Sequence, residues 1–366
     1  MFSSPTLRPS PRLRTSLAML TLAAAAVVII AQSALHATPA RAGDSVPAVT
    51  ARACGWVVPW DNTLSSQSLT ANVKLIGETS PFWFDMTAKG NLSELAGSGD
   101  AALLAAVTAG GANTLPTITN HFDGKRAHRM LRSDATRTAH ATAIADLVAA
   151  RDYDGIDIDY ENLRPADRAR FTAFATTLAT KLHGQGKLLS LTLMSRTATV
   201  AYSGASAENY AALGLVADRI RVMAYDYHYA GSRPGPVAPM PWVREVVSYA
   251  ASQVDPAKLE LGAPLYGFMW TRGQRLATSV TYVKARALAR AQSARIHFHA
   301  TYQEPYAHWH RKHHPRVEMW FEDGRAIDAK LALADEFHLA GVCMWRLGGE
   351  DPDVWKRVAA RWGTPT

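Results

Sequence analysis

Eight short apolar runs alternate with helix-like segments after residue 52, and this alternation restricts the fold more than any other feature of the chain. Alanine-rich stretches such as 135–150, 165–182 and 242–252 separate the runs. Strands that alternate with helices form a parallel sheet, and eight such units close into a barrel. The sequence therefore predicts an α/β fold, a (β/α)8 TIM barrel. Its expected strands are 54–59, 74–83, 114–119, 155–160, 188–194, 220–225, 259–267 and 341–345.

The segment between the seventh and eighth expected strands is too long for a single crossover. It predicts a small α+β insertion over about 270–335, in which residues 318–323 form one strand. Such an insertion would build one wall of a groove above the barrel. The barrel and its insertion together define a single expected domain, 53–366, because a barrel of this length commonly forms one unit.

The first fifty residues differ in composition from the rest of the chain. Arginines precede an uncharged apolar run at 17–31, and Ala40-Arg41-Ala42 has the small-x-small form of a cleavage site. This layout predicts a secretory signal peptide at 1–42 and a disordered lead-in at 43–52. The run of fifteen residues is shorter than the ~20 that a membrane-spanning helix needs, which disfavours stable membrane insertion. The expected location is therefore extracellular or in the cell envelope.

Charge and cysteine content narrow the possible partners. The formal charge is +8, and residues 1–42 contribute four arginines and no acid, so the remaining chain carries +4. No basic stripe interleaved with aromatic residues is present, which disfavours nucleic acid as a partner. The two cysteines, Cys54 and Cys343, fall in the first and last expected strands, which are neighbours in a closed barrel. A disulfide and two buried thiols both remain compatible with that placement. The oligomeric state is not indicated.

The fourth expected strand carries an unusual set of acids. Asp157, Asp159 and Glu161 alternate with apolar residues in Asp154-Gly-Ile-Asp-Ile-Asp-Tyr-Glu161. Successive side chains of a strand point to opposite faces, so the three acids would share one face. Like charges on one face resist ionisation, which packing alone would not favour but which a site that keeps one acid protonated would use. A calcium loop of the EF-hand type would need its glycine and glutamate at other offsets.

The pattern Asp-Gly-x-Asp-x-Asp-x-Glu resembles the signature of family 18 glycoside hydrolases, the chitinase-like retaining enzymes. Met223-Ala-Tyr225-Asp226 is similar to a second element of that family, and counterparts extend over residues 53–350. Tyr225-Asp-Tyr-His228 and Trp345-Arg-Leu-Gly-Gly-Glu-Asp351 resemble the bacterial branch of spore-cortex and cell-wall N-acetylglucosaminidases. The resemblance implies a barrel fold, no cofactor, and a polysaccharide substrate that contains N-acetylglucosamine.

The resemblance also implies roles for individual residues. Glu161 would be the general acid and base, and the substrate's own 2-acetamido oxygen would act as the nucleophile. Asp159 would orient the acetamido N–H, Asp157 would lie behind it and share a proton or steer its charge, and Tyr225 would hydrogen-bond the acetamido group. The three acids should titrate as a coupled set. The expected substrate-binding residues are Asp226, Met223, Trp345, Trp83 and Tyr266.

Several of these residues also have a purely structural interpretation. Tyr225, Met223 and Trp345 could be ordinary core residues of a barrel. Ten tryptophans are spread through the chain, so Trp83, and equally Trp56 and Trp270, could pack in the core instead of stacking on sugars.

Six histidines fall within eighteen residues of the expected insertion. Imidazole is the commonest metal ligand, but no Cys or Glu-x-x-His spacing accompanies them, so a polar surface is the favoured interpretation and no metal site is predicted. The six are His297, His299, His308, His310, His313 and His314.

Two other functions remain compatible with the sequence. A non-catalytic sugar-binding protein could use the same barrel, although the terminal Glu161 of the motif is intact. An endo-β-N-acetylglucosaminidase that acts on protein-linked glycans would use the same motif. The fold does not decide between substrates such as peptidoglycan and chitin.

Overall fold

Eight parallel strands close into a barrel in the computed structural model, which describes residues 52–199, 204–310, 312 and 315–363. The strands are β1 (Ala53–Val57), β2 (Ile76–Met86), β5 (Thr117–Thr119), β6 (Gly155–Asp159), β7 (Leu188–Met194), β8 (Arg219–Met223), β9 (Leu259–Pro264) and β15 (Gly341–Trp345). Each pairs with the next in this order, and β15 pairs with β1, so the predicted (β/α)8 barrel is confirmed. The short strand β3 (Leu92–Glu94) pairs antiparallel with β2, and β4 (Asn113–Thr114) pairs parallel with it ahead of β5.

Prolines divide two of the expected strands. The run 259–267 splits after Pro264, which pairs with Trp345 in the last rung of the barrel. Leu265 N then donates a hydrogen bond to the Trp345 carbonyl, and the chain leaves the barrel for a second sheet. The run 114–119 is interrupted at Pro116 in the same way. Proline has no N–H to donate to a ladder, and periodicity alone did not reveal these breaks.

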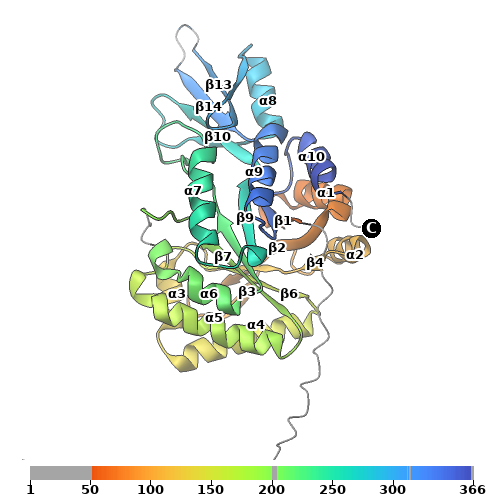
Figure 1. Ribbon diagram of the computed structural model, residues 1–366, viewed down its shortest axis with the longest axis vertical. Coiled ribbons are helices and arrows are strands. Elements are labelled where there is room, and N and C mark those ends of the chain that lie inside the picture. Colours follow the sequence, from red (N-terminus) through yellow and green to blue (C-terminus); the bar gives the residue numbers. More distant parts are fainter. Residues whose placement is uncertain (1–51, 200–203, 311, 313–314, 364–366) are drawn as a thin grey trace, which may run out of the picture. The chain divides into compact units, whose positions relative to one another are not determined.

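Helices surround the barrel (Figure 1). They are α1 (Asn62–Asn72), α2 (Ala101–Gly110), α3 (Gly124–Leu131), α4 (Asp134–Ala150), α5 (Arg168–His183), α6 (Tyr210–Val216), α7 (Met240–Ala251), α9 (Gly324–Glu336) and α10 (Asp353–Trp362). The 3-10 turns are Pro59–Asp61, Val73–Leu75, Pro165–Asp167, Ala205–Ala207 and Pro256–Lys258. Helix α4 begins with a capping box in which Ser133 and Thr136 satisfy each other's backbone N–H groups.

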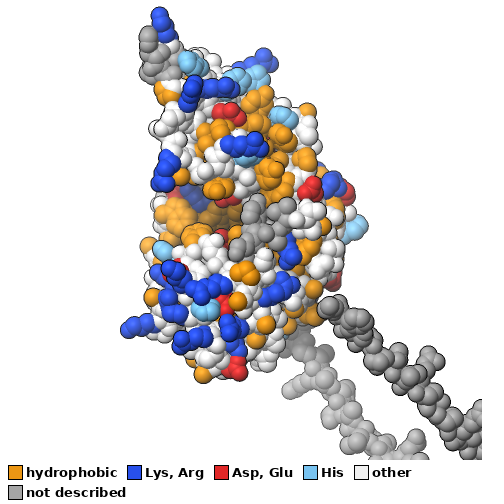
Figure 2. Space-filling model, turned by 90° about the vertical axis from the view of Figure 1, so that its left-hand side faces the viewer, with side chains coloured by type: hydrophobic (Ala, Val, Ile, Leu, Met, Phe, Trp, Pro, Cys, Tyr) orange, Lys and Arg blue, Asp and Glu red, His pale blue; other side chains and the backbone are white. Residues whose placement is uncertain are grey.

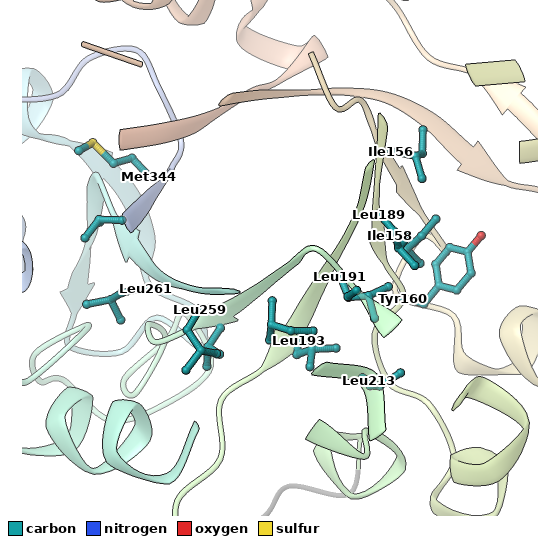
Figure 3. Packing of buried hydrophobic residues seen from close by; sticks show 14 of the residues in the cluster. Ile156, Ile158, Tyr160, Leu189, Leu191, Leu193, Leu213, Leu259, Leu261 and Met344 are labelled. Carbon is teal, nitrogen blue, oxygen red and sulfur yellow. The ribbon is translucent and has the colours of Figure 1, made fainter. Parts of the chain in front are cut away.

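The main hydrophobic core lies between the strands and these helices. Ile156, Ile158 and Tyr160 point away from the barrel axis toward the helices (Figure 3), and none is more than 1% exposed. The Tyr160 ring stacks on Phe174 of α5, and its hydroxyl bonds His140 of α4. Outward packing of these apolar residues turns the alternate residues of β6 into the barrel.

An antiparallel sheet of five strands follows β9. It consists of β10 (Tyr266–Thr271), β11 (Thr278–Thr281), β12 (Ile296–His299), β13 (Glu304–Trp309) and β14 (Val317–Phe321), with α8 (Tyr282–Ala291) between β11 and β12. The strand order is β11-β10-β14-β13-β12. This sheet begins at Tyr266 and ends at Phe321, whereas the expected range was about 270–335, because α9 contacts β9 and β15 and so belongs to the barrel.

Cys54 and Cys343 form a disulfide between β1 and β15, where the two residues are directly paired in the sheet. This decides between the two states that the sequence left open. Within the part of the chain that the structure describes, no helix is long and apolar enough to cross a membrane. The predicted signal peptide and the lead-in to residue 51 lie outside the described residues.

Candidate active site

The carboxyl ends of the barrel strands surround a cavity of about 580 Å³. A hollow near the middle of one face is bordered by hydrophobic side chains (Figure 2). Residues from β1, β2, β6, β7, β8 and β15 and from the loops after them line the cavity, as expected for the functional end of such a barrel. The lining is Trp56, Phe82, Phe122, Asp159, Glu161, Asn162, Thr192, Met194, Ser195, Gly204, Met223, Tyr225, Asp226, Tyr227, Tyr229 and Trp345.

Asp157 is the deepest of the three predicted acids and is fully buried below the cavity. Its carboxylate accepts hydrogen bonds from Thr117 Oγ1 at 2.9 Å, Ser190 Oγ at 2.7 Å and Thr192 Oγ1 at 3.0 Å. Trp56 Nε1 adds a fourth at 3.3 Å. These donors come from β5 and β7, which flank β6, and from β1, so three strands fix the carboxylate.

A buried ionic network inside the barrel supports Asp157 from below. The Arg221 guanidinium, 0% exposed, lies 3.5 Å from Asp157 Oδ1. Its Nε donates to Glu260 Oε2 at 2.6 Å and its Nη2 to Glu78 Oε2 at 3.0 Å, while Nη1 also donates to Ser80. Sequence reasoning missed this network, because nothing in the local patterns of β2, β8 and β9 links the three charges.

Asp159 is 6% exposed, at the floor of the cavity. Burial raises the pKa of Asp159 well above its usual range, and the carboxylates of Glu161, Asp157 and Glu208 add to that rise. Its Oδ1 has no hydrogen-bond partner among the described residues. The Asp159 carboxyl group thus favours its protonated form, and its unpaired Oδ1 is available to a polar group of a bound substrate.

Glu161 follows β6 and is held at its backbone by Asn120. The Glu161 N–H donates to Asn120 Oδ1 at 3.0 Å, and Asn120 Nδ2 donates back to the Glu161 carbonyl at 2.7 Å. The side chain is free to face the cavity. Burial raises the pKa of Glu161 to about 7, and the nearby Asp226 carboxylate contributes to the rise. Such a group can carry a proton near neutral pH and release it on demand.

Glu208 is a fourth acid beside the site that the sequence did not reveal. It is 1% exposed and accepts a hydrogen bond from the Met194 N–H at 3.0 Å. Burial raises the pKa of Glu208 well above its usual range. It lies in a loop outside any strand-end motif, so only the tertiary structure brings it near Glu161.

Tyr225 and Asp226 follow β8 and face the acids of β6. Asp226 has φ 59°, in the left-handed region that non-glycine residues seldom adopt, and the Tyr266 hydroxyl donates to its carboxylate. Burial raises the pKa of Asp226, and this hydrogen bond opposes the rise. Burial, followed by the Asp159 charge, raises the pKa of Tyr225 well above its usual range, so Tyr225 stays a neutral donor.

Three cavity-lining residues other than glycine share a left-handed backbone. Phe122 and Asn162 have φ 55°, and Asp226 has φ 59°. They lie in the loops after β5, β6 and β8. Backbone strain of this kind concentrates at functional sites, where the surrounding structure holds it.

Trp345 forms an aromatic wall of the cavity with residues from β1 and β2. Its ring lies 5.7 Å from that of Trp56 and 5.5 Å from that of Phe82. Trp83 does not belong to this wall. It is 1% exposed and packs against Tyr153 in the core, so the prediction that Trp83 binds substrate is wrong. Neighbouring residues of a strand point to opposite faces, and Phe82 takes the position expected of Trp83.

The structure thus brings together most of the predicted site. Asp159, Glu161, Tyr225, Asp226, Met223 and Trp345 line one cavity, and Asp157 lies directly beneath it. Tyr266 contacts Asp226 from a neighbouring cavity. Trp270, 7% exposed, packs in the second sheet with Phe268 and Trp320.

The described histidines do not converge on a metal site. His297 and His308 stack side by side on β12 and β13, and His310 is exposed, while His313 and His314 lie outside the described residues. Among the described residues, the group of three potential metal ligands that lie close together is Cys54, Glu260 and Cys343. Its two sulfurs are bonded to each other, so this group does not fit a metal ion.

Comparison with known proteins agrees with this geometry. Residues 105–351 match the profile of glycosyl hydrolases family 18. The cortical fragment-lytic enzyme of Bacillus anthracis is 31% identical over 67% of this chain, and that of Bacillus cereus is 30% identical over 75%. The matched regions span 59% and 65% of those two proteins.

Solved structures share the same architecture. The spore cortex-lytic enzyme SleL of Bacillus cereus superposes with a TM-score of 0.78 at 27% identity, covering 85% of this chain and 74% of that one. A chitinase of Chromobacterium violaceum reaches the same TM-score at 20% identity, covering 86% of this chain and all of that one, which shows the shared fold alone.

Proposed function

This chain belongs to glycosyl hydrolase family 18, and on that premise we propose that it hydrolyses glycans containing β-linked N-acetylglucosamine with retention of configuration. The observation that carries the proposal is the cavity itself, where Glu161, Asp159 and Tyr225 converge beside the Trp345 ring. Aromatic rings stack on sugar faces, and the acids supply proton transfer. The intact Glu161 favours an enzyme over a non-catalytic sugar-binding protein.

The chemistry would begin with Glu161 giving its proton to the glycosidic oxygen. The 2-acetamido carbonyl oxygen of the substrate attacks the anomeric carbon as the bond to the leaving sugar breaks, which forms an oxazolinium ion. Asp159 accepts a hydrogen bond from the acetamido N–H, and Tyr225 donates one to the acetamido oxygen. Water then attacks the anomeric carbon and gives a proton to Glu161, and the acetamido group is released.

Asp157 would act through Asp159 and not on the sugar. It has no place on the cavity wall, and the hydroxyls of Thr117, Ser190 and Thr192 hold it beneath Asp159. Its negative charge favours the protonated form of its neighbour. Asp226 and Met223 would enclose the sugar ring on the side of β8.

The rate should fall as pH rises through about 7, because Glu161 must carry a proton and its pKa lies there. The Asp226 carboxylate contributes to that raised pKa, so Asp226→Asn should move the descending limb of the kcat/KM profile to lower pH. The measurement is a pH–rate profile for the wild type and the variant. Asp146→Asn on α4, which removes an exposed acid outside the cavity, should leave the midpoint in place.

A glycan panel tests the reaction class. Chitooligosaccharides, peptidoglycan, protein-linked glycans and a plain β-glucan are incubated with the protein, and products are identified by mass spectrometry. We expect new reducing N-acetylglucosamine ends with at least one acetamido-bearing glycan and no cleavage of the β-glucan. Rapid hydrolysis of the β-glucan would contradict a mechanism that needs the acetamido oxygen. Release at protein-linked glycans alone would select the endo-β-N-acetylglucosaminidase alternative.

We also infer that the protein acts outside the cytoplasm, on peptidoglycan or a chitin-type glycan. The signal-like composition of residues 1–42 supports export, and the Cys54–Cys343 disulfide suits an oxidising compartment. Relatives named cortical fragment-lytic enzymes favour a glycan of the bacterial envelope. Determining the N-terminus of the protein recovered from culture medium tests the export.

A further inference from the structure

A second cavity of about 500 Å³ adjoins the first on the side of the five-stranded sheet. The two cavities share Asp226 and Trp345 in their linings. Both shared residues face the sugar position proposed above. A glycan bound in the first cavity would therefore extend its neighbouring ring into the second. The second cavity is lined by Trp60, Asp226, Leu265, Tyr266, Phe268, Ser279, Thr281, Lys284, Trp345, Arg346 and Gly348.

An exposed tryptophan on this second cavity suits a sugar ring. Trp60 is 61% exposed, and its ring lies 6.2 Å from that of Trp345 and 5.9 Å from that of Phe82. The aromatic wall of the first cavity thus continues into the second. A large apolar side chain left in solvent beside a polar cavity marks a binding surface for an amphipathic ligand.

Cationic side chains outnumber acidic ones in the lining of the second cavity. Its lining contains two cations, Lys284 and Arg346, and one acid, Asp226. Arg346 Nη2 pairs with Asp61 at 2.7 Å, which fixes the guanidinium at the cavity. No acidic side chain among the described residues pairs with the exposed Lys284 ammonium, so this charge remains for a ligand.

Lys284 projects from a well-anchored element. It lies in the first turn of α8, where its N–H donates to Thr281 Oγ1 at 3.3 Å. The preceding residue, Val283, donates its N–H to the Gly349 carbonyl at 3.2 Å, and this hydrogen bond connects α8 to the loop after β15. The same loop carries Gly348, whose N–H donates to the buried Glu350 at 2.7 Å. Lys284 and Arg346 are therefore presented from two segments that are bonded together.

We propose that the second cavity is a subsite for a sugar ring that bears a carboxylate, bound next to the N-acetylglucosamine at the cleaved bond, with Lys284 and Arg346 as its specificity-determining residues. This inference rests on the proposed function for the position of the cleaved sugar. Cations that flank an aromatic surface favour an acidic sugar over a neutral one. Two kinds of sugar supply such a carboxylate: muramic acid, through its lactyl ether, and a uronic acid.

The test compares kcat/KM for three tetrasaccharides of equal length: alternating N-acetylglucosamine and muramic acid, alternating N-acetylglucosamine and glucuronic acid, and neutral chitotetraose. The preference is kcat/KM for the better acidic glycan divided by kcat/KM for chitotetraose. Lys284→Met should lower this ratio about tenfold, the effect of one charge-assisted contact. Lys284→Arg should preserve the ratio, and added salt should reduce it. Arg290→Met, an exposed cation on α8 outside both cavities, is the matched control and should not change it.

The outcomes separate this inference from the proposed function. A ratio that changes less than twofold in Lys284→Met, or equally in Arg290→Met, overturns the acidic subsite while leaving the hydrolase intact. If the wild type cleaves none of the three, the proposed function fails on these glycans. The subsite is then judged by titration calorimetry of the same tetrasaccharides. Binding of an acidic one that is at least tenfold tighter than that of chitotetraose, and weakened by Lys284→Met, supports it; equal binding refutes it. The acid that binds better identifies the source of the carboxylate.

Discussion

Glu161→Gln should lower kcat by roughly 10²- to 10⁴-fold, the usual contribution of a general acid. The amide has the size of the carboxylic acid but cannot donate its proton to a glycosidic oxygen. The Asn120 contacts to Glu161 involve only the Glu161 backbone, so the variant keeps its place at the end of β6. Glu161 makes no ion pair among the described residues, so the free energy of unfolding should change little.

Three measurements on Glu161→Gln separate catalysis from folding and binding. Turnover of the best glycan of the panel gives kcat, calorimetry gives the affinity for that glycan, and thermal unfolding gives stability. We expect loss of turnover with an affinity within a few-fold of the wild type. Glu245→Gln, an exposed acid on α7, is the control and should match the wild type in all three. A Glu161→Gln variant with near wild-type turnover would refute the assignment of the general acid.

Arg221→Met should destabilise the protein by about 3–5 kcal/mol, because the buried acids around it then keep only the partly exposed Arg219, which pairs with Glu78 at 2.9 Å and lies 3.9 Å from Glu260. Burial lowers the pKa of Arg221, but the carboxylates of Glu260, Asp157 and Glu78 together raise it above its usual range. Burial raises the pKa of Glu78 to about 7, with the Glu260 charge adding to the rise. The buried Arg221 guanidinium, together with Arg219 at the edge of the network, therefore offsets the charges of these acids.

The triple variant Arg221→Met, Glu78→Gln, Glu260→Gln should recover part of that stability, since neutral groups of similar size then replace Arg221 and the two acids that pair with it. The free energies of unfolding come from chemical denaturation. Arg244→Met is the control, because the Arg244–Glu336 pair is about half exposed and should contribute at most about 1 kcal/mol. A loss below about 1 kcal/mol in Arg221→Met, or a triple variant less stable than the single one, would contradict the compensation.

The barrel was predictable because its signal is local. Each strand is a short apolar run between helix-like stretches, and all eight expected runs overlap a barrel strand. The boundaries were less predictable where Pro116 and Pro264 interrupt apolar runs. The second sheet was expected in outline, but its first strand, β10, directly continues the apolar run of β9. Only the hydrogen bonds show where one sheet ends and the next begins.

The candidate site divides in the same way. Asp157, Asp159 and Glu161 are spaced at alternate positions, so the local geometry of one strand places them on one face. Trp83 was expected to bind substrate, but it is buried in the core, next to a register shift of β2 against β5 between Phe82 and Phe84. A shift of one residue exchanges the two faces of a strand. A register shift depends on the neighbouring strand β5, which the residues of β2 do not encode.

By itself, the sequence determined the parallel barrel, the acidic strand β6 and the Met-x-Tyr-Asp element after β8. In each case the periodicity of a few neighbouring residues fixes which side chains share a face. The tertiary structure alone decided that Cys54 bonds Cys343, that Glu78, Arg221 and Glu260 meet beneath Asp157, and that Lys284 joins Arg346 at a second cavity. These contacts join residues that lie 39 to 289 positions apart in the sequence. No local pattern couples such distant residues, because their encounter depends on closure of the barrel and on the side-chain packing that follows it.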